Sequence, residues 1–213
     1  IFLSFEKFEL KQVMIHSSYG AGAAILAAVL TIGILPFFET GLGILSDGKL
    51  LSLANPNQEL IRKILTEAPG TYHHSVMVAN LSESACEAIG ANGLLARVGS
   101  YYHDIGKTVQ PHYFIENQIG MRNPHDFISP KDSAEIIISH VTCGTEMLKE
   151  HNLPQEIIDI CQQHHGTSLV EYFYRTEVNN NPDKEIDKAD FRYPGPKPMT
   201  KEAGVISICD SVE

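Results

Sequence analysis

The chain has 213 residues, of which 43% are hydrophobic, enough apolar material for one or two domains with a buried core. Its 26 acidic residues outnumber its 16 basic residues and give a net charge of −10. Binding along a long nucleic acid needs many phosphate contacts from Lys and Arg, and the sequence holds no basic block to make them. A small phosphorylated substrate stays compatible with this charge, because bound divalent cations make a site locally positive.

Residues 1–44 have the composition of the end of a membrane region. Residues 12–38 include no Asp, Glu, Lys or Arg, and residues 19–38 are almost wholly apolar. About 20 such residues span a bilayer, and the small residues among them suit packing against other membrane helices. We expect a transmembrane helix over residues 19–38, ended or kinked by Pro36, with a buried core helix as the alternative. Before it, a short helix could carry an apolar face made of Phe2, Phe5, Phe8 and Leu10.

A connector with repeated Gly and Asn-Pro turn signals follows at residues 39–57. We place the domain boundary within it, so that residues 45–213 form a second domain onto which Leu50, Leu51 and Leu53 dock. The chain lacks an initiator Met and stops inside a helical pattern. We therefore expect it to be part of a longer protein, with the second domain truncated at its C-terminus.

The second domain is predicted to be all-α, because helical periodicity returns after each turn signal. Helices are expected over residues 58–68, 72–89, 91–103, 130–151 and 154–165, and from Thr200 onward. Pro69-Gly70-Thr71 is expected to break the first of these helices. Residues 108–129 are expected to form a loop with a possible short helix, of a length that is usually functional or disordered. Residues 177–190 are predicted to be a polar surface loop, and the Pro-rich segment 191–198 suits neither a helix nor a central strand.

The four cysteines form no Cys-x-x-Cys pair and no zinc-finger spacing. We interpret them as small hydrophobic side chains on predicted helices, which fits a reducing compartment. They are Cys86, Cys143, Cys161 and Cys209.

Candidate metal ligands recur on successive predicted helices. Alone, each has an ordinary explanation, since a single His is usually structural and a His pair at a helix end can simply interact with the helix dipole. Together they are too many for one open site of about four ligands, and they suit two divalent metals that share Asp104 through its two oxygens. Such a pair can activate a hydroxide and stabilise the oxygens of a phosphoryl centre. The candidates are His74, His103, Asp104, His140, His164, His165 and Asp210.

Two neighbours of these ligands are interpreted differently. Lys107 follows His103-Asp104 and either holds a phosphate oxygen or is a solvated surface lysine. His73 adjoins His74 but points about 100° away around a helix, so we leave it out of the ligand set.

The order of His74, His103-Asp104 and Asp210 resembles the HD-domain metal-dependent phosphohydrolases, and His140 with His164-His165 resembles their binuclear branch. Longer motifs are similar to the seven-transmembrane-receptor HD family, whose PgpH-type members are bacterial cyclic di-AMP phosphodiesterases. The motifs lie at residues 68–75, 102–107, 113–118, 163–167 and 191–198, and residues 33–39 resemble the end of that family's last membrane helix.

This resemblance implies an all-α HD-domain helical bundle that follows the last transmembrane helix of a multi-pass membrane protein and faces the cytoplasm. It implies second-messenger signalling by hydrolysis of cyclic di-AMP to linear pApA, with two metals, iron or manganese, that activate a hydroxide. Asp104 and Lys107 would then be the residues that act in catalysis.

Two adenines need apolar or aromatic surfaces, for which Tyr72, Tyr113, Phe114 and Tyr193 are candidates. Arg122 or Arg192 could hold the second phosphate. The alternative is that most of these aromatic side chains belong to the core. Two other functions stay open at this point: an HD hydrolase that acts on another nucleotide, and a catalytically silent ligand-binding sensor.

Overall fold

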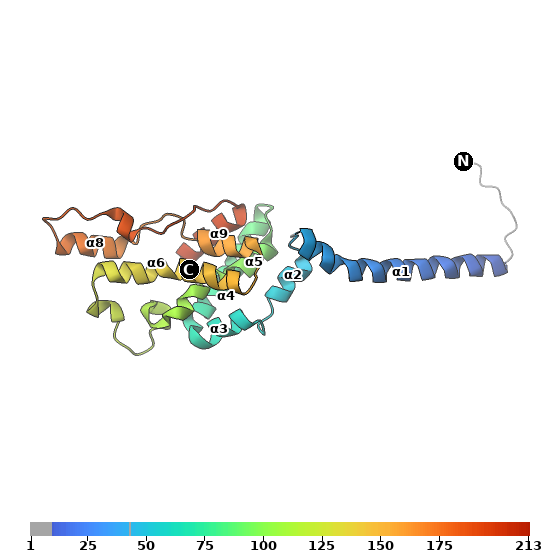
Figure 1. Ribbon diagram of the computed structural model, residues 1–213, viewed down its shortest axis with the longest axis horizontal. Helices are drawn as coiled ribbons and strands as arrows, with labels where there is room; N and C mark the ends of the chain where they lie inside the picture. The colour runs from blue at the N-terminus through green and yellow to red at the C-terminus, as the bar shows by residue number, and fades with distance from the viewer. Residues whose placement is uncertain (1–9, 43) are drawn as a thin grey trace. The chain divides into compact units, whose positions relative to one another are not determined.

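The computed structural model describes residues 10–42 and 44–213, so the short helix expected before Leu10 lies outside the described residues. The chain divides into two compact units, Ile1–Ser46 and Asp47–Glu213. The all-α prediction is confirmed: the described elements are helices, and the described β-structure is a single antiparallel bridge between Leu169 and Arg192 (Figure 1).

The first unit is formed by α1 (Leu10–Leu42). Its stretch Leu10–Leu35 is long and apolar enough to cross a membrane, with a mean hydropathy of 1.9, and 0% of it is buried. Of the two outcomes expected at Pro36, an end or a kink, the end is wrong, because α1 continues to Leu42. A proline removes one backbone hydrogen bond, and the bonds on either side can maintain the helix.

The second unit begins within the predicted connector, where α2 (Asp47–Leu53) forms a short helix. Leu50 and Leu53 are buried as expected, whereas Leu51 is 61% exposed. Residues three apart share one face of a helix, and Leu51 points away from that face. After α2 come α3 (Glu59–Glu67), α4 (Pro69–Ala88) and α5 (Gly93–Tyr102).

The expected break after the helix at residues 58–68 is present at Ala68, but Pro69-Gly70-Thr71 do not form a turn between helices, because they are the first turn of α4. Only Ala68, with φ −137°, separates α3 from α4. Proline is well suited to the first helical position, where its missing N–H would have no intrahelical partner.

The long loop at residues 108–129 consists largely of short 3₁₀ turns. They are η1 (Ile105–Val109), η2 (Pro111–Tyr113), η3 (Ile115–Asn117) and η4 (Pro124–Phe127). Turns of this kind satisfy backbone groups locally without a full helix. The loop is thus ordered as a series of turns that follow directly on His103-Asp104.

The remaining helices are α6 (Pro130–Glu150), α7 (Gln155–Gln163), α8 (Glu171–Asn180) and α9 (Lys201–Val212). Thr200 caps α9, as predicted: its hydroxyl accepts a hydrogen bond from the backbone N–H of Ala203. The polar loop predicted from residue 177 begins later, because residues 177–180 form the last turn of α8. A further 3₁₀ turn, η5 (Lys188–Phe191), precedes the Pro-rich segment.

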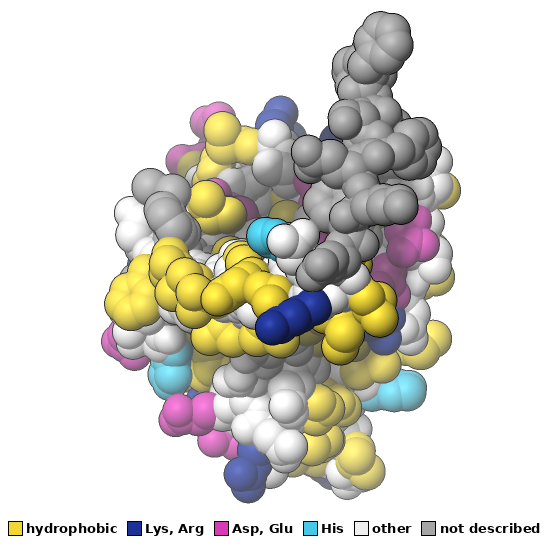
Figure 2. Space-filling view, turned by 90° about the vertical axis from the view of Figure 1, so that its right-hand side faces the viewer, with side chains coloured by type: hydrophobic (Ala, Val, Ile, Leu, Met, Phe, Trp, Pro, Cys, Tyr) yellow, Lys and Arg dark blue, Asp and Glu magenta, His cyan; other side chains and the backbone are white. Residues whose placement is uncertain are grey.

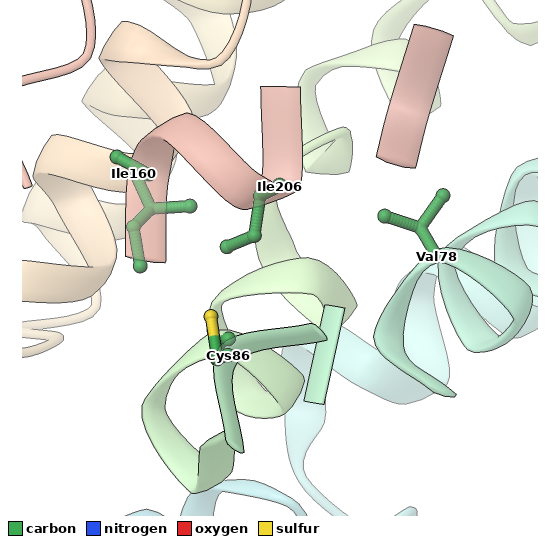
Figure 3. Packing of buried hydrophobic residues seen from close by; sticks show 6 residues of the cluster. Val78, Cys86, Ile160 and Ile206 are labelled. Carbon is green, nitrogen blue, oxygen red and sulfur yellow. The ribbon is translucent and has the colours of Figure 1, made fainter. Parts of the chain in front are cut away.

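A hydrophobic core joins α4, α5, α7 and α9 (Figure 3). Figure 3 shows Val78, Cys86, Ile160 and Ile206 converging from these helices, and Ala96 and Ala203 complete the cluster. All four cysteines are free thiols; Cys86 and Cys161 are buried, and the other two are partly exposed. Burial of such apolar surface stabilises the bundle. It fixes α4 and α9, which carry His74 and Asp210, and α5 and α7, which end next to His103 and His164.

Candidate metal centre

The structure brings all seven candidate ligands together. They form two groups in which the possible ligand atoms lie within 4.8 Å of one another, and Asp104 belongs to both. The first group is His74, His103, Asp104 and Asp210, and the second is Asp104, His140, His164 and His165. His103, Asp104 and His164 are buried almost completely, whereas His74, His165 and Asp210 are partly exposed.

Asp104 stands between the two groups, and each of its oxygens faces one of them. Its Oδ2 lies 3.3 Å from His103 Nε2 and 3.6 Å from His74 Nε2. Its Oδ1 lies 3.2 Å from His140 Nε2 and 3.5 Å from His164 Nε2. A carboxylate placed this way can bridge two cations, one on each oxygen.

The other nitrogen of three histidine rings is held by a backbone carbonyl three residues earlier. Nδ1 donates from His103 to Ser100 at 2.7 Å, from His140 to Ile137 at 2.5 Å and from His164 to Cys161 at 2.7 Å. A carbonyl only accepts, so Nδ1 carries the proton and Nε2 offers a lone pair to the cluster. Hydrogen bonds of this kind fix the ring orientation of metal-ligating histidines.

The cluster has fewer hydrogen-bond donors than its buried acceptor atoms need. Among the described residues, His103 Nε2 and both oxygens of Asp104 are buried with no hydrogen-bond partner of good geometry. The Nε2 atoms of His140 and His164 face each other at 3.3 Å, although the carbonyl bonds make both of them acceptors. Buried acceptors left unpaired in this way are costly, and cations between them would remove the cost. The donor set therefore fits divalent metals.

Charges within the cluster support the same conclusion. Burial and the neighbouring His164 and His140 lower the pKa of His165 to about 2, so its ring is neutral as a metal ligand must be. Burial acts to raise the pKa of Asp104, but His103 and Lys107 hold it well below its usual range. Burial opposes protonation of His103, yet Asp104 and Asp210 raise its pKa to about 10. Asp104 and Asp210 thus favour a positive charge beside His103, and a bound metal ion can supply that charge in place of a proton on the ring.

A glycine allows the backbone beside Asp104 to approach α6, which carries His140. A Cβ on Gly106 would lie 1.9 Å from the carbonyl oxygen of His140 and 2.6 Å from the backbone nitrogen of Gly144. Only glycine allows η1 to lie so close to α6. This contact sets the distance between Asp104, just before η1, and His140 on α6.

An open cavity of about 560 Å³ gives access to the cluster, and its lining includes His74, His165, Asp210 and Lys107. Lys107 Nζ lies 2.7 Å from Asp104 Oδ2 and donates to Glu116 Oε1 at 3.0 Å. Burial tends to lower the pKa of Lys107, but the two carboxylates raise it, so the side chain stays an ammonium. Lys107 is therefore not a freely solvated surface lysine.

The sequence reasoning missed two acidic residues at this cavity. Glu116 pairs with Lys107, and the Glu213 carboxylate accepts a hydrogen bond from His74 Nδ1. A carboxylate behind a metal-ligating histidine is a common orienting partner. Glu116 lies within a family motif, whereas helical spacing offered the one signal for Glu213, three residues after Asp210 on the final helical pattern.

The expected substrate contacts are dispersed. Tyr193 is buried and its ring lies 4.3 Å from that of His165, beside the cluster. Tyr113 packs against His125 with ring centroids 5.2 Å apart, and Arg192 donates to the Thr167 carbonyl. Tyr72 is half-buried on α4, and Arg122 is exposed in the loop before η4. Phe114 is 5% exposed, with its ring centroid 5.7 Å from that of His140.

Comparison with known proteins gives the family of this fold. The model of the HD domain matches residues 71–213, which include all seven candidate ligands. The chain belongs to the HD domain family. The expected relationship to PgpH-type proteins is also confirmed by the high identities that follow.

Two curated relatives of the HD domain chain are cyclic-di-AMP phosphodiesterases named PgpH. The one from Bacillus subtilis is 61% identical over 194 residues, and the one from Listeria monocytogenes is 56% identical over 187 residues. These alignments cover 91% and 88% of this chain but 27% and 26% of the relatives, so the chain spans about a quarter of their length. A crystal structure of the L. monocytogenes PgpH HD domain in complex with cyclic-di-AMP is 58% identical, with a TM-score of 0.71 and coverage of 75% of this chain and 73% of that one.

Basic side chains do not gather on the face shown in Figure 2, where Lys and Arg lie singly among acidic, polar and apolar side chains.

Proposed function

We propose that this chain carries the catalytic domain of a metal-dependent phosphodiesterase that hydrolyses cyclic di-AMP to linear pApA in bacterial second-messenger signalling. The observation that carries the proposal is the pair of ligand groups that share Asp104, beside an open cavity that His74, His165 and Asp210 line. The substrate assignment is supported by the relatives named for this reaction and by the 58% identical HD domain crystallised with cyclic-di-AMP.

The chain's own residues would act as follows. His74, His103 and Asp210 would hold one metal, His140, His164 and His165 the other, and Asp104 both. When bound, two divalent transition-metal ions, iron or manganese, supply Lewis-acid activation of water and neutralise charge at the phosphoryl centre. Lys107 directs its ammonium to the same cavity, where it can hold a phosphate oxygen.

We also propose an arrangement for the whole chain. α1 is the last transmembrane helix of a multi-pass protein of the cell membrane, residues 1–44 belong to that membrane region, and residues 45–213 form the HD domain on the cytoplasmic side. The length and hydropathy of α1 support the membrane span. Protease accessibility of the HD domain in right-side-out and inverted membrane vesicles tests the orientation, and cleavage from the outer face would contradict it.

Hydrolysis of cyclic di-AMP beside cyclic di-GMP tests the reaction and the substrate together. The full chain, purified in detergent, is incubated with each dinucleotide in the presence of Mn²⁺ and then with excess chelator. We expect Mn²⁺-dependent release of pApA with little cleavage of the guanine analogue. No turnover of either dinucleotide by the metal-loaded chain would contradict the proposal and would favour another phosphorylated substrate or a silent sensor.

A further inference from the structure

The segment 113–118 was singled out in the sequence by its resemblance to a family motif, and the structure shows that it crosses the start of α4. α4 begins after Ala68, and no side chain at its own N-cap accepts a hydrogen bond. The missing cap comes from η3: Asn117 Oδ1 accepts from the N–H of Gly70 at 2.9 Å and from that of Thr71 at 3.2 Å. The first N–H groups of any helix have no partner within the helix, so they need an acceptor from elsewhere.

A continuous set of polar contacts leads from this cap to the metal centre. Asn117 Nδ2 donates to Thr71 Oγ1 at 2.8 Å, and the Thr71 hydroxyl lies 3.0 Å from Glu116 Oε1, to which it donates. The same oxygen accepts from Lys107 Nζ at 3.0 Å. Lys107 Nζ in turn lies 2.7 Å from Asp104 Oδ2.

The backbone of this region is shaped for the contact. A Cβ on Gly70 would lie 2.0 Å from the carbonyl oxygen of Glu116, so η3 can approach α4 only because residue 70 is glycine. Phe114 is buried just before η3, whereas Ile115 is 79% exposed. The polar contacts of Glu116 and Asn117, together with Phe114, therefore hold the segment in place.

Lys107 needs such a partner, because a lysine is a compact charge on a flexible four-carbon stem. Asp104 and Glu116 lie on either side of its ammonium: Glu116 accepts one N–H, and Asp104 forms an ion pair with it at 2.7 Å. A remaining N–H can point to the cavity that Lys107 and Glu116 both line. We propose that Glu116 is a positioning residue which, with Thr71 and Asn117, fixes the Lys107 ammonium so that one donor meets a phosphate oxygen of the substrate. This inference rests on the proposed phosphodiesterase function.

Steady-state kinetics of the full chain with Mn²⁺ and cyclic di-AMP test the proposal. Glu116→Gln should lower kcat about 10- to 100-fold, because small displacements of a positioned group are costly. Glu116→Gln should change kcat less than about twofold when Lys107→Met is already present, since Glu116 acts through Lys107. Glu83→Gln is the matched control: Glu83 pairs with Arg97 and is 26% exposed, against 25% for Glu116. It should leave kcat unchanged.

A second readout needs neither metal nor substrate. In metal-free protein labelled with ¹⁵N-lysine, the paired and largely buried ammonium of Lys107 should give a visible ¹H–¹⁵N signal, assigned by its loss in Lys107→Arg. Glu116→Gln should abolish or shift this signal, whereas Glu83→Gln should preserve it. An unchanged signal in Glu116→Gln, or an equal loss of kcat with and without Lys107, would overturn the proposal. If the wild-type chain is inert toward cyclic di-AMP but the signal depends on Glu116, the positioning contact stands and the proposed function fails.

Discussion

Gly106→Ala is expected to separate the two halves of the metal centre. The added Cβ would lie 1.9 Å from the His140 carbonyl, whereas ordinary contact begins at 3.4 Å, so η1 and α6 must move apart by about 1.5 Å. Asp104 Oδ1 and His140 Nε2 are now 3.2 Å apart. Metal–ligand distances tolerate only about 0.2 Å, so this movement would remove His140 from the second group. We expect a stability loss of about 1–3 kcal/mol from the overpacking.

Two measurements on the purified chain check this expectation. Metal analysis after loading with Mn²⁺ should show that the metal held by His140, His164 and His165 is lost, and turnover of cyclic di-AMP should fall about 100-fold. Gly204→Ala is the matched control, because a Cβ at Gly204 meets nothing within 4 Å. As a glycine inside α9, it should gain about 0.5–1 kcal/mol in stability and keep both metals.

The reasoning is refuted if Gly106→Ala keeps full metal content and full turnover. Such a result would mean that the approach of η1 to α6 does not set the separation of Asp104 and His140. Lower stability with unchanged metal content would likewise show that the contact at Gly106 affects packing but does not determine the geometry of the metal centre.

The other predictions concern the ligands and the elements that hold them. Asp104→Ala should abolish both metal binding and turnover, whereas Asp183→Ala, in an exposed loop, should preserve both; full activity in Asp104→Ala would contradict the two-metal scheme. Removal of both metals by chelator should lower the unfolding temperature by about 10–20 °C, as measured by calorimetry, because each of the two sites contributes about 2.7 kcal/mol at about 100 times its metal Kd. Thr200→Ala should cost about 1 kcal/mol in denaturant unfolding, because it removes the cap of α9. Glu213→Gln should weaken metal binding about 10-fold by isothermal titration, because His74 Nδ1 loses its carboxylate partner; an unchanged affinity would show that Glu213 does not orient His74.

The helices and the cluster of ligands were predictable because they depend on local signals. Ser129 and Thr200 are strong N-cap residues, and both accept the backbone bonds expected of them. His140 was expected to face the bundle interior because a metal ligand in the middle of this helix must do so, and its side chain is buried. The remaining ligands were predictable because they follow one another along the chain in the order of the HD motif.

What the sequence did not predict depends on contacts between distant segments. Pro69-Gly70-Thr71 has the composition of a break, but Asn117 caps this turn from the loop and makes it the start of α4. Glu116 gains its partner Lys107 only when η3 folds against α4. Residues 177–180 are polar and still helical, since they continue α8 before the chain turns. Propensity alone is a weak guide at such positions because tertiary contacts override it.

The central claim is that seven side chains hold two metal ions that share Asp104. Anomalous diffraction from crystals of the chain grown with Mn²⁺ tests it most directly. We predict two anomalous peaks a few ångströms apart, one beside each oxygen of Asp104, the first bounded by His74, His103 and Asp210 and the second by His140, His164 and His165. A single peak, or two peaks that do not share Asp104, would contradict the account.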